Sequence, residues 1–428
     1  DTAGIPSTQR RNGKGSFSLR NPKTDQDIID YTEAYGNAPV ELILKLAETV
    51  KKASGNRLAV GVYAGSTVLN VDTNTQAYGR IFQYPLLQSP FIDFIAAPTY
   101  GPRRLGHPGA IGLVHSSLQL HGKLGINEYD VRTWLSKIKS DRENFLYGYT
   151  PDWERQRAVF LKMFVRDITS GVGSWQYDMH HGWFDALEIW SLFHQVRSIR
   201  KEASAKNRKS VAEVAIVVDD KSQIYLPRND HMLNLNAVGS QRTPIGWTGA
   251  PYDLYFLNDI LDERVRGYKC YVFLNTLQID DAARQRIHEI LRKNNATAVW
   301  VYAAGIVANG VLSTDNIEKL TGIAVKETSA PFPDVILRNA PHPLLNGIEG
   351  HGSGIKEEII VPKGGKLPPS YLGNRAPAFS GRKFFSPTDK GGTEILGYLR
   401  ETELPGIAVR KMAGWTSIYS SAPVLSAE

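Results

Sequence analysis

The feature that most constrains the fold of this chain is an alternation of short apolar runs of strand character with longer segments of helical periodicity. Four runs of strand character occupy residues 57–65, 91–100, 123–127 and 171–179. Helical segments are predicted between and around them, at 39–54, 76–87, 108–120, 150–168 and 183–204. Strands that alternate with helices favour a parallel sheet with right-handed crossovers. The first part of the chain therefore predicts parallel α/β structure.

A second α/β pattern begins at Val211, after a charged linker at 203–210. Strands are predicted at 211–220, 268–275 and 297–305, and helices at 252–265, 279–293 and 314–320. This alternation is typical of an open, flavodoxin-like sheet. We expect two domains, at 1–205 and 211–428. The Pro- and Gly-rich part at 330–405 is predicted to be irregular and to cover a surface or serve contacts between subunits.

Composition excludes several classes of protein. The net charge of +7 is spread along the 428 residues without a basic and aromatic stripe, so we expect no nucleic-acid partner. Cys270 is the only cysteine, which excludes an internal disulfide and a cysteine zinc site. No apolar run is long enough to cross a membrane. The strands are not followed by a dinucleotide fingerprint or a P-loop, which disfavours a nucleotide site and an α/β oxidoreductase. We expect no cofactor and no metal.

Candidate site residues follow the four predicted strands of the first part. They are Tyr63, Tyr100, Glu128 with Asp130 and Arg132, and Trp175 with Asp178 and Trp183. In a (β/α)8 barrel the active site is assembled at the carboxyl ends of the strands. Flat aromatic faces beside charged groups suit a sugar, which offers faces to stack on and hydroxyls to bind. Glu128 is the centre of this set, because a carboxylate at the end of a buried strand needs partners or a raised pKa.

Four strand–helix units cannot close an eight-stranded barrel. Either two half-barrels come together, or the sequence starts halfway through the domain. The beginning at Asp1, without Met or a leader, favours the second interpretation and leaves the cell compartment open.

Two segments carry a resemblance to a known family, HGKLGINEYDVRTWL and GVGSWQYDMHHGWF. They resemble the second half of the catalytic barrel in β-galactosidases of glycoside hydrolase family 42. Two later segments, YKCYVFLNTLQIDDAARQRIHEILRKNNATAVWVYAAG and GWTSIYSSAPVLSAE, resemble the β-galactosidase trimerisation domain. The resemblance implies the C-terminal half of a (β/α)8 barrel, strands five to eight, followed by a flavodoxin-like α/β trimerisation domain. It also implies a carbohydrate substrate and a homotrimer.

The family implies a retaining β-glycosidase with an acid/base on the fourth strand and a nucleophile on the seventh. If the chain supplies strands five to eight, Glu128 ends the seventh and is the expected nucleophile, with the acid/base upstream of Asp1. The second carboxyl would lie about 5 Å away. An Asn-Glu pair marks the acid/base in related barrels, and Asn127-Glu128 has that form. Strand counting favours the nucleophile, because one further strand–helix unit follows Glu128 where a fourth-strand position needs four.

By the same resemblance Tyr63, Tyr100, Arg132, Trp175 and Trp183 line the sugar pocket, and Asp178 binds hydroxyls. Arg132 near Glu128 would keep the nucleophile ionised, although Asp130 can instead pair with Arg132 for structural reasons. Asp130 or Asp178 would have to serve as the acid if translation starts at Asp1. The alternative function is a non-catalytic carbohydrate-binding or assembly protein derived from such a glycosidase.

Overall fold

A computed structural model describes most of the chain. The described ranges are 4–12, 18–65, 81–100, 103–137, 147–179, 181–206, 208–227, 235–262, 264–331, 335–338, 341–348, 351–353 and 383–423. No helix in these ranges is long and apolar enough to cross a membrane.

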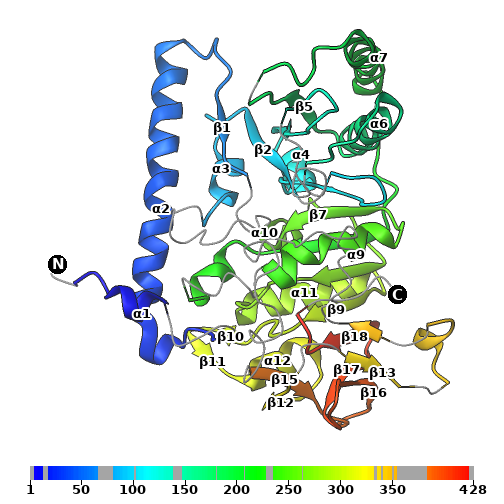
Figure 1. Cartoon of the computed structure of the whole chain (residues 1–428). Coiled ribbons are helices and arrows are strands. Elements are labelled where there is room, and N and C mark those ends of the chain that lie inside the picture. Colours follow the sequence, from blue (N-terminus) through cyan, green and yellow to red (C-terminus); the bar gives the residue numbers. More distant parts are fainter. Residues whose placement is uncertain are drawn as a thin grey trace.

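The first sheet holds the four predicted strands in the order β1-β2-β4-β5, all parallel. Its strands are β1 (Gly61–Tyr63), β2 (Phe94–Tyr100), β4 (Leu124–Tyr129) and β5 (Gly173–Gln176), with β3 (Ala110–Ile111) paired antiparallel to β2. The helices of this part are α1 (Thr8–Asn12), α2 (Pro22–Ala53), α3 (Tyr84–Gln88), α4 (His115–Leu120), α6 (Trp153–Thr169) and α7 (Leu187–Ser204). Figure 1 shows the long α2 beside β1 and the α6–α7 pair beyond β5. The three parallel pairings of these four strands follow from the alternation in the sequence.

Helix α2 is joined to the first sheet by an ion pair at its last turn. Lys51 Nζ lies 2.6 Å from a carboxylate oxygen of Asp93, and the same oxygen accepts a hydrogen bond from the Val60 backbone N–H. The helix begins at Pro22 after Asn21, whose side chain accepts a hydrogen bond from the Lys23 N–H. Proline at the first helical position and a capping asparagine are favourable start signals.

The second sheet has nine strands, in the order β14-β13-β16-β17-β18-β9-β8-β6-β7. Its parallel part is formed by β6 (Val214–Val218), β7 (Tyr252–Phe256), β8 (Cys270–Phe273), β9 (Thr297–Val301) and β18 (Trp415–Ser420). Numbered along the chain, these five strands lie in the order 2-1-3-4-5. That order is the flavodoxin-like one. The expected flavodoxin-like topology is therefore confirmed.

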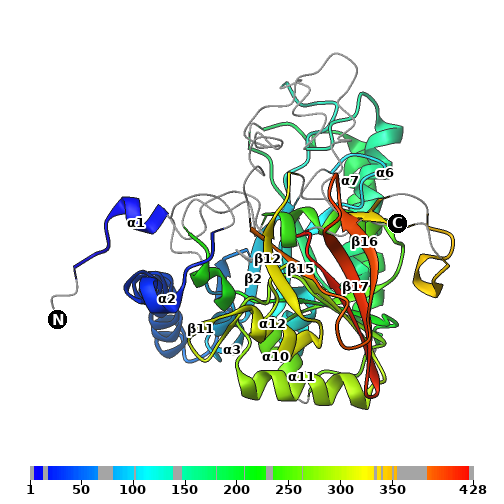
Figure 2. The ribbon, with the colours of Figure 1, turned by 90° about the horizontal axis from the view of Figure 1, so that it is seen from below.

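The remaining strands extend the second sheet or lie beside it. They are β10 (Val307–Ala308), β11 (Val311–Leu312), β12 (Val325–Ser329), β13 (Val335–Leu337), β14 (His351–Ser353), β15 (Lys383–Pro387), β16 (Thr393–Leu399) and β17 (Pro405–Met412). The helical elements are η2 (Lys221–Tyr225), η3 (Leu235–Ser240), α9 (Arg242–Trp247), α10 (Leu257–Leu261), α11 (Asp281–Lys293), α12 (Thr314–Thr321) and η4 (Pro343–Leu345). Figure 2 shows α11 along one side of the second sheet's part of the molecule. The strands β16 and β17 lie along another side of that part. Within 330–405, which was expected to be irregular, the described residues include the strands β13, β14, β15 and β16, and residues 354–382 lie outside the described part.

The largest error of the sequence prediction lies at 252–265, where a helix was expected. Residues Tyr252–Phe256 form β7, and the helix α10 that follows is short. Leu254 and Phe256 are buried at strand spacing, so a period of two prevails over the helical one. The predicted helix at 108–120 shortens to α4 in the same way, because Ala110 and Ile111 pair with β2. At 76–87 the described helix, α3, begins at Tyr84, and residues 66–80 lie outside the described part.

The two sheets meet along a seam of polar contacts between α4 and β7. β7 is the edge strand of the second sheet, and its backbone N–H groups at Leu254 and Phe256 donate to the hydroxyls of Ser116 and Ser117, at 3.0 and 2.9 Å. An unpaired edge strand is exposed to association with other strands. Here serine hydroxyls from the first part of the chain satisfy that edge. One cluster of buried apolar residues also runs through both parts.

A second contact between the two parts is made by the acidic pair that follows β6. Asp220 accepts hydrogen bonds from the backbone N–H groups of Gln83 and Tyr84, at 2.9 and 3.0 Å. Asp219 accepts one from the Ser222 N–H, at 2.8 Å. Burial raises the pKa of Asp219 to about 7, and the neighbouring Asp220 charge adds to the shift. Folding therefore favours the protonated form of Asp219.

We expect Asp219 to make the protein less stable as the pH rises from about 4 toward 7. Because the folded pKa lies above the unfolded one, the stability that protonation supplies is complete below about pH 4 and is lost as the pH rises through about 7. Between pH 5 and pH 8 the loss is about 2–3 kcal/mol, from about two pKa units. Urea unfolding at these two pH values should show a smaller difference for Asp219→Asn than for the wild type. An equal difference in both proteins would contradict this assignment.

Candidate active site

Glu128 lies at the carboxyl end of β4, in register with Pro98 of β2 and Trp175 of β5. Its side chain is 8% exposed. Burial raises the pKa of the Glu128 carboxyl above its ordinary value. A hydrogen bond with Tyr63 opposes this shift, Asp130 adds to it, and Arg103 opposes it. The carboxylate therefore lies in a partly dry environment with a tyrosine and an arginine that favour its charged form.

Tyr63 and Trp175 bring two aromatic rings over the same face of the sheet. They come from β1 and β5, the outer strands of the parallel order, three strand spacings or about 14 Å apart in a flat sheet. Their ring centroids are nevertheless 6.5 Å apart, with an interplanar angle of 44°. The side chains therefore converge across a concave face, as expected for a segment of a barrel. Both rings remain accessible, at 52% and 48% exposure.

Arg132 lies in a cage of aromatic rings. Its guanidinium carbon is 4.1 Å from the ring centroid of Tyr147 and 4.0 Å from that of Trp183. It also pairs with the carboxylate of Asp130. Arginine over an aromatic face is a favourable cation–π contact. Of the two roles that the sequence left open for Asp130 and Arg132, the geometry favours the mutual pair, and the cation that acts on Glu128 is Arg103.

Two further predicted residues have structural contacts. Trp183 is buried and forms one side of the Arg132 cage, so its ring faces no open pocket among the described residues. Asp178 accepts a hydrogen bond from the Trp183 backbone N–H at 3.0 Å, and its second carboxylate oxygen is buried without a partner in the described ranges. Tyr100 ends β2, but its side chain lies outside the described part.

The sequence prediction missed two residues that act on Glu128 or on its partner Tyr63. Arg103 is buried, and its guanidinium donates to the backbone oxygen of Thr99 at 2.7 Å. Tyr177 follows β5 and lies close enough to Tyr63 to raise the pKa of its hydroxyl, after burial and the Glu128 and Asp130 charges. Their signal was their position, because both come directly after a strand of the first sheet. Within the described ranges no group of three metal-binding side chains occurs.

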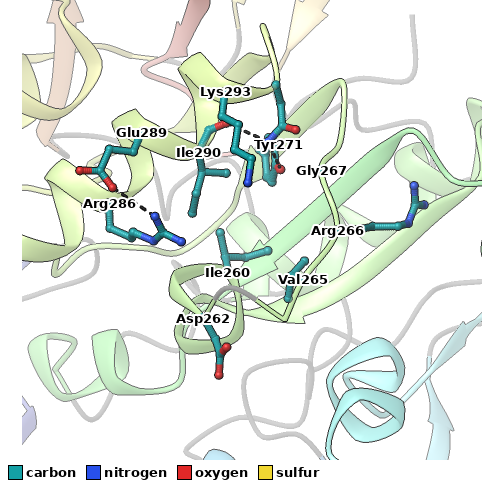
Figure 3. Close-up of a pocket in the computed structure, with 11 residues that line it drawn as sticks. Ile260, Asp262, Val265, Arg266, Gly267, Tyr271, Arg286, Glu289, Ile290 and Lys293 are labelled. Atoms are coloured by element: carbon teal, nitrogen blue, oxygen red, sulfur yellow. Dashed lines mark hydrogen bonds and ion pairs between the residues drawn. The ribbon is translucent and has the colours of Figure 1, made fainter.

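A hollow of about 320 Å³ opens on the second sheet's side of the molecule, between α10, residues 265–267 and α11. In Figure 3 Arg286 and Lys293 extend from α11, and Ile260 and Val265 lie opposite. Arg286 forms an ion pair with Glu289 at 3.1 Å. Asp262 forms one at 2.8 Å with Arg264, which does not line the hollow. Its one aromatic lining residue, Tyr271, is buried. The hollow therefore lacks the exposed ring faces that Glu128 has beside it.

No protein-family model matches the sequence, and no curated protein matches it. Solved structures do. The β-galactosidase from Rahnella sp. R3 is 14% identical, with a TM-score of 0.51 over 79% of this chain and 49% of its own. Over the matched region this chain has the fold of a β-galactosidase. The chain spans about half the length of that enzyme, and at this identity the likeness concerns the fold alone.

Two other β-galactosidases match with lower scores. The enzyme from Bacillus circulans sp. alkalophilus is 12% identical, with a TM-score of 0.46 over 83% of this chain and 53% of its own. A glycoside hydrolase family 42 enzyme from G. stearothermophilus is 13% identical, with a TM-score of 0.45 over 81% and 53%. The fold class expected from the sequence is confirmed by the first match and by the strand order: an α/β chain with part of a barrel and a flavodoxin-like second sheet. The division between residues 205 and 211 stays a prediction.

Proposed function

We propose that the protein is a retaining β-glycosidase that acts on β-galactosides or related β-linked sugars, with Glu128 as the nucleophile. The observation that carries this proposal is the position of Glu128 on the concave face of a β-galactosidase fold. Its carboxylate is bound by the Tyr63 hydroxyl, and the Tyr63 and Trp175 rings converge beside it. Sugar rings stack on such faces, and the anomeric carbon would lie within reach of the carboxylate.

A nucleophilic carboxylate must be ionised when it attacks. Burial alone would favour the neutral form of Glu128, and Tyr63 and Arg103 counteract it. The partly dry environment then strengthens the interaction of the carboxylate with the positive charge that develops on the sugar. The environment of Glu128 thus supports an ionised carboxylate whose attraction to the sugar is only partly screened by water.

The acid/base is a separate question. A retaining mechanism needs a second carboxyl about 5 Å from the nucleophile. Asp130 is the carboxylate that acts on Glu128 electrostatically, but it is paired with Arg132. We propose that the acid/base comes from a segment that lies beside the outer edges of β1 and β5, which have no strand partner within the described ranges. Such a segment would also cover the exposed apolar side of α2 beside β1, at Leu42, Leu46 and Val50.

The test is mechanism-based labelling of the full-length protein. A 2-fluoro β-galactoside with a good leaving group traps the glycosyl-enzyme, because the fluorine slows its hydrolysis. Peptide mass spectrometry should then find the sugar on the peptide that contains Glu128. Label on a different carboxylate would overturn the assignment of the nucleophile.

The alternative is a carbohydrate-binding protein without catalysis. The observation that favours it is the pairing of Asp130 with Arg132, which leaves no free acid beside Glu128 among the described residues. In that case no covalent label forms, and galactosides still quench the fluorescence of Trp175. Trp175→Phe should remove that quenching, whereas the same change at the exposed Trp247 should not.

We also propose that the second sheet's part mediates a homotrimer, on the strength of its resemblance to the trimerisation domain. The flavodoxin-like strand order supports the resemblance at the level of the fold. Mass photometry or sedimentation should give three times the mass of the chain, which is 47.5 kDa for the 428 residues. A monomeric mass at micromolar concentration would contradict it.

A further inference from the structure

Asp167 lies on α6, directly behind Glu128 on the other face of β4. Its side chain is fully buried. Successive side chains of a strand point to opposite faces, so Glu128 points to the concave face while Asn127 and Tyr129 point toward the helices. Asp167 therefore meets both chain neighbours of Glu128.

Each oxygen of the Asp167 carboxylate binds a different neighbour of Glu128. Oδ1 accepts a hydrogen bond from Asn127 Nδ2 at 3.1 Å. Oδ2 accepts one from the Tyr129 hydroxyl. Arg200 of α7 approaches the same Oδ2 at 3.4 Å. The carboxylate thus connects two positions of the strand that are separated by Glu128 alone.

The contacts continue to the backbone of Glu128 itself. The Thr99 hydroxyl of β2 lies 2.8 Å from the Glu128 carbonyl oxygen and 3.1 Å from Asn127 Oδ1. Strand β4 is consequently held at Asn127, Glu128 and Tyr129 by side chains of α6 and β2. These polar contacts surround Glu128, whose carboxylate is hydrogen-bonded to Tyr63.

A buried carboxylate is a costly way to attach a helix to a strand. Desolvation raises the pKa of Asp167 to about 6, against the effects of Arg166, Tyr129, Arg200 and Asn127. An apolar side chain at this position would pack without that cost. Hydrogen bonds, unlike apolar packing, fix direction as well as contact. The Asp167 carboxylate therefore fixes the orientation of the strand, at a higher free-energy cost than an apolar side chain would have.

We propose that Asp167 is a positioning residue for Glu128: its carboxylate fixes the strand on both sides of Glu128 and so sets the direction in which the Glu128 carboxylate points. The effect on hydrolysis rests on the proposed function, but the effect on the Glu128 side chain does not. A displacement of about 1 Å in a catalytic group can lower the rate about 100-fold. Asp167 would act through this alignment without touching the substrate.

The experiment compares Asp167→Asn with Tyr268→Phe in the full chain. Tyr268→Phe is the matched control, because it removes a partly buried hydroxyl–carboxylate hydrogen bond, 2.6 Å to Asp253, in the second sheet's part. The first readout is carbodiimide labelling of Glu128 relative to the exposed Glu188, followed by peptide mass spectrometry. The second is amide hydrogen exchange at 127–129. The third is kcat and KM for an aryl β-galactoside.

We expect Asp167→Asn to increase the relative labelling of Glu128 several-fold and the exchange at 127–129 about tenfold. It should lower kcat by about 10- to 100-fold with less than a threefold change in KM. Tyr268→Phe should change thermal stability alone. Unchanged labelling and exchange in Asp167→Asn, or equal changes in both variants, would overturn the proposal. If the wild type neither cleaves nor binds galactosides, the proposed function fails while the first two readouts still decide the role of Asp167.

Discussion

Glu128→Gln should lower kcat/KM for an aryl β-galactoside by at least about 1,000-fold and abolish trapping by the 2-fluoro sugar. An amide cannot attack the anomeric carbon, so the covalent step is lost, and losses of this size are typical when a nucleophile is removed. The substitution is isosteric, and the Tyr63 hydroxyl can still donate to the amide oxygen. The fold is expected to be unaffected. Glu188→Gln, at an exposed position on α7, is the control and should retain full activity.

Azide rescue then distinguishes a nucleophile from an acid/base at the same position. In Glu128→Ala, azide can attack the anomeric carbon from the side that the carboxylate occupied, which gives an α-glycosyl azide from a β-galactoside. If Glu128 were the acid/base, azide would attack the covalent intermediate and the product would be a β-glycosyl azide. NMR of the product separates the two. A β-azide would exclude the nucleophile role and favour the alternative that the Asn127-Glu128 pair raises.

Arg132→Met should destabilise the protein by about 3–5 kcal/mol, the cost of removing one partner from a buried ion pair. The change leaves the Asp130 carboxylate unpaired and removes a cation from between the rings of Tyr147 and Trp183. Methionine keeps the apolar part of the cage filled. The loss of stability therefore measures the removal of the Arg132 charge more than a change in side-chain volume. Chemical denaturation provides the measurement.

The control for Arg132→Met is Arg155→Met, which breaks the exposed pair with Asp152 at 2.5 Å. Exposed pairs contribute about 0–1 kcal/mol. Comparable losses in the two variants would mean that the cage around Arg132 is no stronger than a surface contact. An additional effect on Glu128 is expected, since an unpaired Asp130 charge raises the Glu128 pKa further.

The sequence alone predicts the features that depend on local patterns. The four parallel strands of the first sheet, the strands β6, β8 and β9 of the second sheet and the position of Glu128 at the end of a strand follow from apolar runs and from the turns between them. The helix expected at 252–265 was wrong because the pattern there is ambiguous. β7 is selected by partners distant in sequence, such as the Ser117 hydroxyl that accepts from the Phe256 N–H. Tertiary contacts of this kind override local propensity.

Prediction of the site residues from the sequence is limited in the same way, by tertiary contacts that local patterns do not encode. An aromatic residue after a strand predicts a sugar-binding face equally for Trp175 and Trp183. In the structure the first is half exposed beside Tyr63, and the second packs against Arg132. The difference arises from the path of the segment after β5, where Asp178 binds the Trp183 N–H. Spacing along the chain does not encode that path, and for the same reason Arg103 could not be distinguished from Arg132 as the cation that acts on Glu128.

The serine hydroxyls that complete the edge of β7 have a consequence for how the molecule comes apart. If the first part were removed, the N–H groups of Leu254 and Phe256 would lose the acceptors that Ser116 and Ser117 provide. Separation would also divide the apolar cluster that runs through both parts. The two sheets should therefore unfold in a single cooperative transition, although they are wound as two separate layers. In calorimetry this appears as one peak, and a fragment that starts at Val211 should expose a reactive edge and aggregate.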